Sequence, residues 1–146
     1  TKNVVWDRAS EDTSGLKIIY KKNNVAKHLH RIDKLVIDIS NHNNNQKSLE
    51  KHIQVVPCEW MPVFVFLDNN LAPSQGIRTL LMQEMLSMGV LFQGIFVPSY
   101  SHKEDDIYYF AKAFDQALDT YKRALDRGFE KMLVGEPAKA VFRKYI

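Results

Sequence analysis

The side chains best suited to chemistry in this chain are five histidines and a single cysteine. His28 and His30 are two residues apart within a helical pattern, so they point in different directions and cannot hold one metal ion side by side. His102 lies next to a run of acidic residues in what reads as a helix cap, which favours a structural role over acid–base work. We therefore expect no metal site and no catalytic histidine.

Cys58 lies between Pro57 and Glu59 with no histidine nearby in the sequence. A reactive thiol needs a positively charged or hydrogen-bonding neighbour that stabilises the thiolate, so inert packing is the expected role of Cys58. A phosphate-binding loop is not expected either. The spacing of four glycines matches neither the dinucleotide-binding nor the P-loop pattern, and they are Gly89, Gly94, Gly128 and Gly135.

The composition is that of one globular domain, with 146 residues of which 45% are hydrophobic and 25% charged. The net charge is +3 and the positive residues are spread along the chain, which argues against a nucleic-acid partner. The longest apolar run, 61–67, is far shorter than the roughly 20 residues of a membrane-spanning helix. With no signal-peptide pattern and one cysteine, we expect a cytoplasmic protein without a membrane partner.

Two helices are predicted in the first two thirds of the chain. Apolar residues recur at spacings of three and four from Val25 to Ile39, and the Asn-rich stretch 41–45 should end this helix because asparagine favours turns. A second helix should begin at Ser74 or Gln75 and end at Gly89, which can adopt the left-handed conformation of a helix stop. A shorter helix is expected over 16–22.

A further long helix is predicted over 104–127. Ser101 and Glu104 have the spacing of a capping box, and the acids that follow suit the positive end of the helix dipole. Phe110 and Phe114 belong to its apolar stripe and should be buried. The helix should end near Gly128.

Three segments read as strands, namely 53–56, 61–67 and 90–97, because they are rich in β-branched and aromatic residues. In the second strand, alternation should place Phe64 and Phe66 on one face of the sheet. The expected fold is α/β of the α+β kind, a small and mostly antiparallel sheet covered by helices in a two-layer sandwich. Residues 1–14 read as a connecting segment, and 15–146 as one domain with an irregular tail from Met132.

Four motifs between Gly76 and Lys122 occur in a recognisable order. A helix is followed by Gly89-Val90-Leu91, then by Ser99-Tyr100-Ser101-His102, then by an acidic turn ending in Ile107, and then by a long alanine-rich helix. This order resembles the closing segment of the class III pyridoxal-phosphate aminotransferases, specifically the glutamate-1-semialdehyde aminomutase branch. The strand region 57–67 and the tail 133–145 are similar to the same family, so the resemblance covers residues 15–146.

The resemblance implies the C-terminal small domain of a fold-type I enzyme, which helps to shape the active-site cleft and is not catalytic alone. The family's Schiff-base lysine and the residues that hold pyridoxal phosphate lie in a large domain, N-terminal to this segment. This chain is therefore expected to contain no catalytic and no cofactor-binding residue, and Lys17, Lys27 and Lys112 read as surface lysines. The expected partners are that large domain and, in the parent enzyme, a second copy. Thr1 at the start suggests an excised piece or a processed chain.

One stretch departs from the family. The aminomutases carry a glutamate near the active site, and alignment on His102 places Gly94 at that position. Gln93 and Gly94 are therefore the candidates for lining the substrate cleft, and the parent's substrate need not be glutamate-1-semialdehyde. Two other readings stay open, a free-standing α/β module that binds a ligand or a protein, and a nucleic-acid-binding domain.

An excised domain should also expose apolar surface that the missing domain covered. The candidates are the segment Val4-Val5-Trp6 and, near the break at Gly94, Phe92 with Ile95. Self-association through these groups is the expected consequence.

Overall fold

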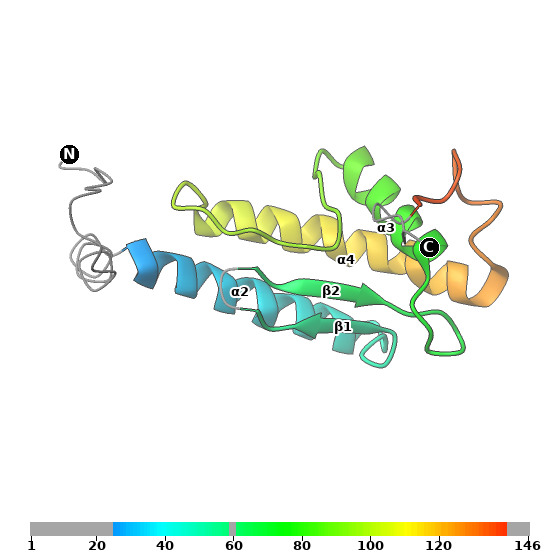
Figure 1. Cartoon of the computed structure of the whole chain (residues 1–146), viewed down its shortest axis with the longest axis horizontal. Coiled ribbons are helices and arrows are strands. Elements are labelled where there is room, and N and C mark those ends of the chain that lie inside the picture. Colours follow the sequence, from blue (N-terminus) through cyan, green and yellow to red (C-terminus); the bar gives the residue numbers. More distant parts are fainter. Residues whose placement is uncertain (1–24, 59–60, 140–146) are drawn as a thin grey trace, which may run out of the picture.

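In the part of the chain that the structure describes, the fold consists of three helices and one β-hairpin (Figure 1). The computed structural model describes residues 25–58 and 61–139, so the expected connecting segment 1–14 and the short helix 16–22 lie outside the described residues. Helices α2 and α4 lie alongside each other, and the antiparallel hairpin packs against them. The predicted small α+β fold is confirmed. In chain order its elements are α2 (Val25–Gln46), β1 (Ile53–Val56), β2 (Val63–Phe66), α3 (Gln75–Ser87) and α4 (Glu104–Arg127).

The hairpin has one inner and one outer face, set by the alternation of its side chains. Val55 pairs with Phe64, and both Phe64 and Phe66 are buried, whereas Val63 and Val65 on the opposite face are half-buried. The predicted division of the strand is therefore confirmed. The strand is shorter than the predicted range 61–67, since β2 runs only from Val63 to Phe66.

Aromatic rings fill the space between the hairpin and α4. The ring of Phe64 meets Phe92 edge-on at a centroid distance of 5.0 Å and Phe114 at 5.6 Å. Phe92 in turn lies 5.1 Å from Phe110. Edge-to-face pairs of this kind add to the free energy of burial. Phe110 and Phe114 are both buried, as the sequence predicted.

Helix α4 has the predicted bounds but a different cap. Lys103 is the N-cap residue, and the carboxylate of Asp106 accepts a hydrogen bond from its backbone N–H at 2.8 Å. The prediction that Ser101 caps the helix is wrong by two residues. Three acidic residues still occupy the first turn, where they stabilise the positive end of the helix dipole.

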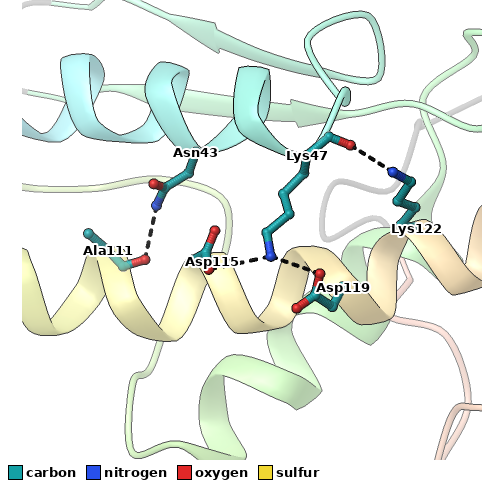
Figure 2. Close-up of polar contacts among 6 residues, drawn as sticks. All are labelled: Asn43, Lys47, Ala111, Asp115, Asp119 and Lys122. Atoms are coloured by element: carbon teal, nitrogen blue, oxygen red, sulfur yellow. Dashed lines mark hydrogen bonds and ion pairs between the residues drawn. The ribbon is translucent and has the colours of Figure 1, made fainter.

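Helix α2 continues through the Asn-rich stretch that was expected to end it. The Asn43 side-chain amide donates to the backbone carbonyl oxygen of Ala111 in α4 at 3.0 Å, and Asn44 is 1% exposed (Figure 2). Contacts with α4 thus outweigh the low helix propensity of asparagine. The helix ends only at Gln46, and Ser48 then takes the left-handed conformation with φ of 58°.

Lys47 ties the end of α2 to α4 (Figure 2). Its ammonium group lies 2.8 Å from the carboxylate of Asp119 and 3.5 Å from that of Asp115. Lys122 donates back to the Lys47 carbonyl oxygen at 3.2 Å. These contacts fix how the two long helices lie along each other.

The segment 128–139 is irregular, as predicted for the tail from Met132 onward, and it lies along α3. Gln83 donates to the carbonyl oxygen of Met132 and accepts from the N–H of Val134. Thr79 accepts from the N–H of Ala138 at 2.8 Å. Within 25–58 and 61–139, no helix is long and apolar enough to cross a bilayer.

Candidate functional site

The segment between α3 and α4 carries the two predicted cleft residues, Gln93 and Gly94. It begins at Gly89, which has φ of 80° and ends α3 as predicted. The expected strand 90–97 does not form as a regular strand. Its middle nevertheless lies along the edge of the hairpin.

Two backbone hydrogen bonds join this segment to β2 and to the residue before it. The Phe64 N–H donates to the Gly94 carbonyl oxygen at 2.7 Å, and the Phe96 N–H donates to the Pro62 carbonyl oxygen at 2.9 Å. Between them, Ile95 forms an antiparallel bridge with Val63. Ile95 therefore extends the outer face of the hairpin. The prediction of a third antiparallel element is right for these residues only.

Gly94 has no room for an ordinary side chain. Its φ of 87° lies in the left-handed region, where residues with a Cβ are strained. A Cβ there would lie 3.3 Å from the Phe66 ring and 3.5 Å from the Arg78 Nε atom. The absence of a side chain at this position lets the guanidinium of Arg78 approach the turn.

Gln93 and Phe92 point to opposite sides of the turn. Phe92 is 3% exposed and belongs to the aromatic core, so the prediction that it forms part of an exposed interface is wrong. The alternation that sends Phe92 inward leaves Gln93 exposed. Ile95 remains 44% exposed, as an interface residue would be.

Arg78, in the first turn of α3, holds the turn in place. Its Nε and Nη2 atoms lie 3.1 and 2.7 Å from the carbonyl oxygen of Gln93, so both N–H groups of one edge converge on that oxygen. Nη1 donates to the side-chain oxygen of Gln75 at 3.1 Å. A guanidinium with three hydrogen bonds in a planar fork fixes the position of its acceptor.

These residues line one open pocket of about 240 Å³. Its walls come from β2, from the start of α3 and from the turn, and it brings Gln93 and Gly94 together with Arg78. Sequence reasoning missed Arg78 entirely. Its partner is a main-chain carbonyl 15 residues further along, which no side-chain pattern reveals.

His102 stabilises the turn that leads into α4. Its Nδ1 atom accepts from the Ser99 N–H at 2.9 Å, and His28 Nε2 donates to the His102 carbonyl oxygen at 2.7 Å. The structural role expected of His102 is therefore confirmed, although it acts through a turn and not through the cap. Among the described residues, no group of three His, Cys, Asp or Glu side chains could hold a metal ion.

Cys58 does not have the packing role that was expected. Its side chain is exposed, and it lines a second pocket with His30 and Asp33 of α2. The exposure follows from its place just after β1, where the chain leaves the sheet. The thiol forms no disulfide.

The described lysines lie on the surface, with one exception. Lys27 and Lys112 are exposed as predicted, whereas Lys17 lies outside the described residues. Lys47 is half-buried, and its hydrogen bond to Asp119 raises its pKa above the ordinary value of a lysine. A raised pKa keeps the amine protonated, and a protonated amine is not a nucleophile.

Comparison with protein-family models, with curated proteins and with solved structures finds no match to this chain.

Proposed function

We propose that this chain is the C-terminal small domain of a pyridoxal-phosphate-dependent aminotransferase or aminomutase, of the class III branch that includes glutamate-1-semialdehyde aminomutase. The domain shapes one side of the active-site cleft, and the cofactor and its lysine belong to a large domain that precedes it. The parent enzyme is a homodimer of the cytoplasm. An exposed free thiol at Cys58 agrees with such a reducing compartment.

The observation that carries this proposal is the position of the Gln93–Gly94 turn. The turn lies at the edge of the outer sheet face, beside an open pocket, and Arg78 holds its main chain. Val56, on that face, is 44% exposed, as is Ile95. A cleft-forming domain needs such an arrangement, because a fixed turn and an apolar face must both be available to the domain that closes the cleft.

The motifs of the resemblance also belong to one structural unit. Helix α3, the turn and helix α4 share one hydrophobic core, to which they contribute Leu81, Phe92 and Phe110 respectively. The alanine positions of α4, including Ala113 and Ala117, are buried and let the helix approach its neighbours closely. The order of the motifs therefore has a physical reason in the packing of this domain.

The state of the lysines supports a catalytic lysine elsewhere in the parent. A Schiff-base lysine needs a pocket that lowers its pKa, so that the neutral amine is available. Among the described residues, the lysines are exposed except for Lys47, whose pKa is shifted in the opposite direction. We therefore expect the lysines of the described residues to form no Schiff base with pyridoxal phosphate.

The substrate of the parent is an amine or keto compound for which Gly94 takes the place of the aminomutase glutamate. Loss of a carboxylate at the cleft removes a group that would attract a cation or accept a hydrogen bond. We therefore do not restrict the parent reaction to glutamate-1-semialdehyde.

The test is to express the coding region upstream of Thr1 together with this chain. We expect a visible absorbance band that survives dialysis and disappears on reduction with borohydride. Peptide mapping should then find the pyridoxyl group on a lysine that precedes Thr1. A pyridoxyl group on a lysine of residues 1–146 would contradict the proposal. A parent without any bound cofactor would favour a free-standing binding module instead.

A further inference from the structure

The pocket beside Gly94 contains a single charged side chain, that of Arg78. The other side chains that line it are apolar or neutral, and no carboxylate among the described residues forms an ion pair with Arg78. Arg78 as a whole is half-buried, and the hydrogen bonds of its guanidinium are exposed, so a ligand from solvent can reach the charged group. A positive charge without a counter-ion creates a local potential that attracts an anion.

The hydrogen bonds of Arg78 leave part of its binding capacity free. A guanidinium carries five N–H groups. One on Nε, one on Nη2 and one on Nη1 donate to Gln93 and Gln75. One N–H on Nη1 and one on Nη2 remain without an acceptor among the described residues. Two free donors on neighbouring nitrogens match the two oxygens of a carboxylate.

We propose that this pocket binds the carboxylate of a small aliphatic molecule, with Arg78 as the residue that recognises it. The bonds to the Gln93 carbonyl hold the guanidinium in a fixed orientation, so little side-chain entropy is lost when the anion binds. Val65 and Ile95 supply apolar walls for the aliphatic part of the ligand. Gly94, which has no side chain, forms the part of the pocket wall next to Arg78.

A carboxylate suits the pocket better than a phosphate. A phosphate dianion has more acceptor oxygens than two N–H groups can satisfy, and a single cation leaves part of its charge unbalanced. The apolar walls would desolvate that remaining charge at a cost. Carboxylate and phosphate are therefore separate arms of the test.

The identification of the ligand with the substrate of the parent enzyme rests on the proposed function, whereas carboxylate binding does not. In the parent, Arg78 would be a specificity-determining residue at the cleft. The binding step can be measured on the present chain without cofactor. If this chain does not bind butyrate, the mapping of the pyridoxyl lysine in the parent enzyme remains a valid test of the proposed function. If no such lysine is found, the butyrate result remains valid for this chain.

The experiment is a titration of the isotope-labelled chain with butyrate, followed by amide NMR shifts. We expect saturable shifts at Gln93 and Gly94, and no comparable shifts with butyramide, the uncharged isostere. Arg78→Gln should weaken butyrate binding roughly tenfold or more, because the charge-assisted bonds are lost. Arg31→Gln removes the same charge from α2, away from the pocket, and should leave binding unchanged.

A second variant keeps Arg78 and its contacts in place. Ile95→Glu puts a carboxylate at the pocket and should abolish butyrate binding by pairing with the guanidinium, whereas Ile95→Gln should retain it. The proposal is overturned if Arg78→Gln or Ile95→Glu binds butyrate as tightly as the unsubstituted chain does. It is equally overturned if butyramide shifts the same amides, if inorganic phosphate binds more tightly than butyrate, or if the butyrate shifts do not saturate.

Discussion

The hydroxyl of Tyr121 in α4 is bonded to both main-chain polar groups of Leu67, at the end of β2. It accepts from the Leu67 N–H at 3.1 Å and donates to the Leu67 carbonyl oxygen at 2.6 Å. Tyr121 is 1% exposed, so these bonds lie in the core. The Leu67 N–H also donates to the His52 carbonyl oxygen at 2.8 Å, whereas the Leu67 carbonyl oxygen has no other partner among the described residues. The Tyr121 hydroxyl thereby satisfies a carbonyl that the two-stranded sheet leaves unpaired and joins the sheet to the longest helix.

Tyr121→Phe should therefore destabilise the fold by about 1–3 kcal/mol, because it leaves the buried carbonyl oxygen of Leu67 without a partner. The free energy of unfolding from urea denaturation measures the effect. Tyr109→Phe is the matched control, since the Tyr109 hydroxyl donates to the Met88 carbonyl oxygen from an exposed position. A loss equal to that of the control would show that the buried bonds contribute nothing special.

The same residue predicts how stability depends on alkaline pH. Burial raises the pKa of the Tyr121 phenol above its ordinary value of 10.0. At a pH above 10.0 but below the raised pKa, the Tyr121 phenol has lost its proton in the unfolded chain and keeps it in the folded chain. Stability is thus fully present below about pH 10 and falls as the pH rises further. Between pH 8 and pH 11, the free energy of unfolding in urea should fall more steeply for the unsubstituted chain than for Tyr121→Phe. Parallel curves would refute this assignment.

Glycine at position 94 is required by the backbone and by its neighbours. Gly94→Ala should cost about 2 kcal/mol, since a Cβ is strained at a positive φ and meets the Phe66 ring. Gly135→Ala is the control, because nothing lies within 4 Å of the Cβ that it would add. Thermal unfolding of both variants tests the prediction. Equal stability of the two would mean that the turn relaxes without cost.

The ion pairs of Lys47 should contribute little to stability. Lys47→Met removes the contacts with Asp115 and Asp119, both of which are more than a third exposed. Exposed pairs are screened by solvent, so the expected loss is about 0.5 kcal/mol at low salt and smaller still at high salt. Urea unfolding at two ionic strengths measures this. A loss that does not depend on salt would point to packing of the lysine stem instead.

The sequence predicted those elements whose own pattern determines them. Helix α4 has the predicted bounds because its apolar stripe, its acidic first turn and Gly128 all agree. Strand β1 was likewise predicted with its bounds. By contrast, α2 runs past its predicted end because Asn43 finds a partner in α4, which is 68 residues away in the sequence. Local propensity cannot register such a contact.

The candidate site was predicted only in part, for the same reason. Gln93 and Gly94 were named from the family pattern, and the structure places them together at one pocket. Arg78 was not found because its acceptor is a main-chain oxygen. Phe92 was assigned to the surface because it lies near the break at Gly94, where the missing large domain was expected to pack. The turn at Gly94 sends Phe92 into the core and Ile95 outward.

The apolar residues of the segment between α3 and α4 lead to the last prediction. Leu91 is 77% exposed and Val97 is 62% exposed, and Ile95 lies between them on the same segment. Under the proposed function the large domain covers them, so the isolated chain should self-associate through this surface. The double change Leu91→Ser and Val97→Ser should shift the sedimentation distribution towards monomer at high concentration. It should not lower stability, because neither side chain belongs to the core. Val134→Ser is the control, since Val134 is 91% exposed but lies on the tail beside α3, so it should leave association unchanged. If the unsubstituted chain stays monomeric at high concentration, this surface has no tendency to be covered. That result would remove one support of the two-domain proposal.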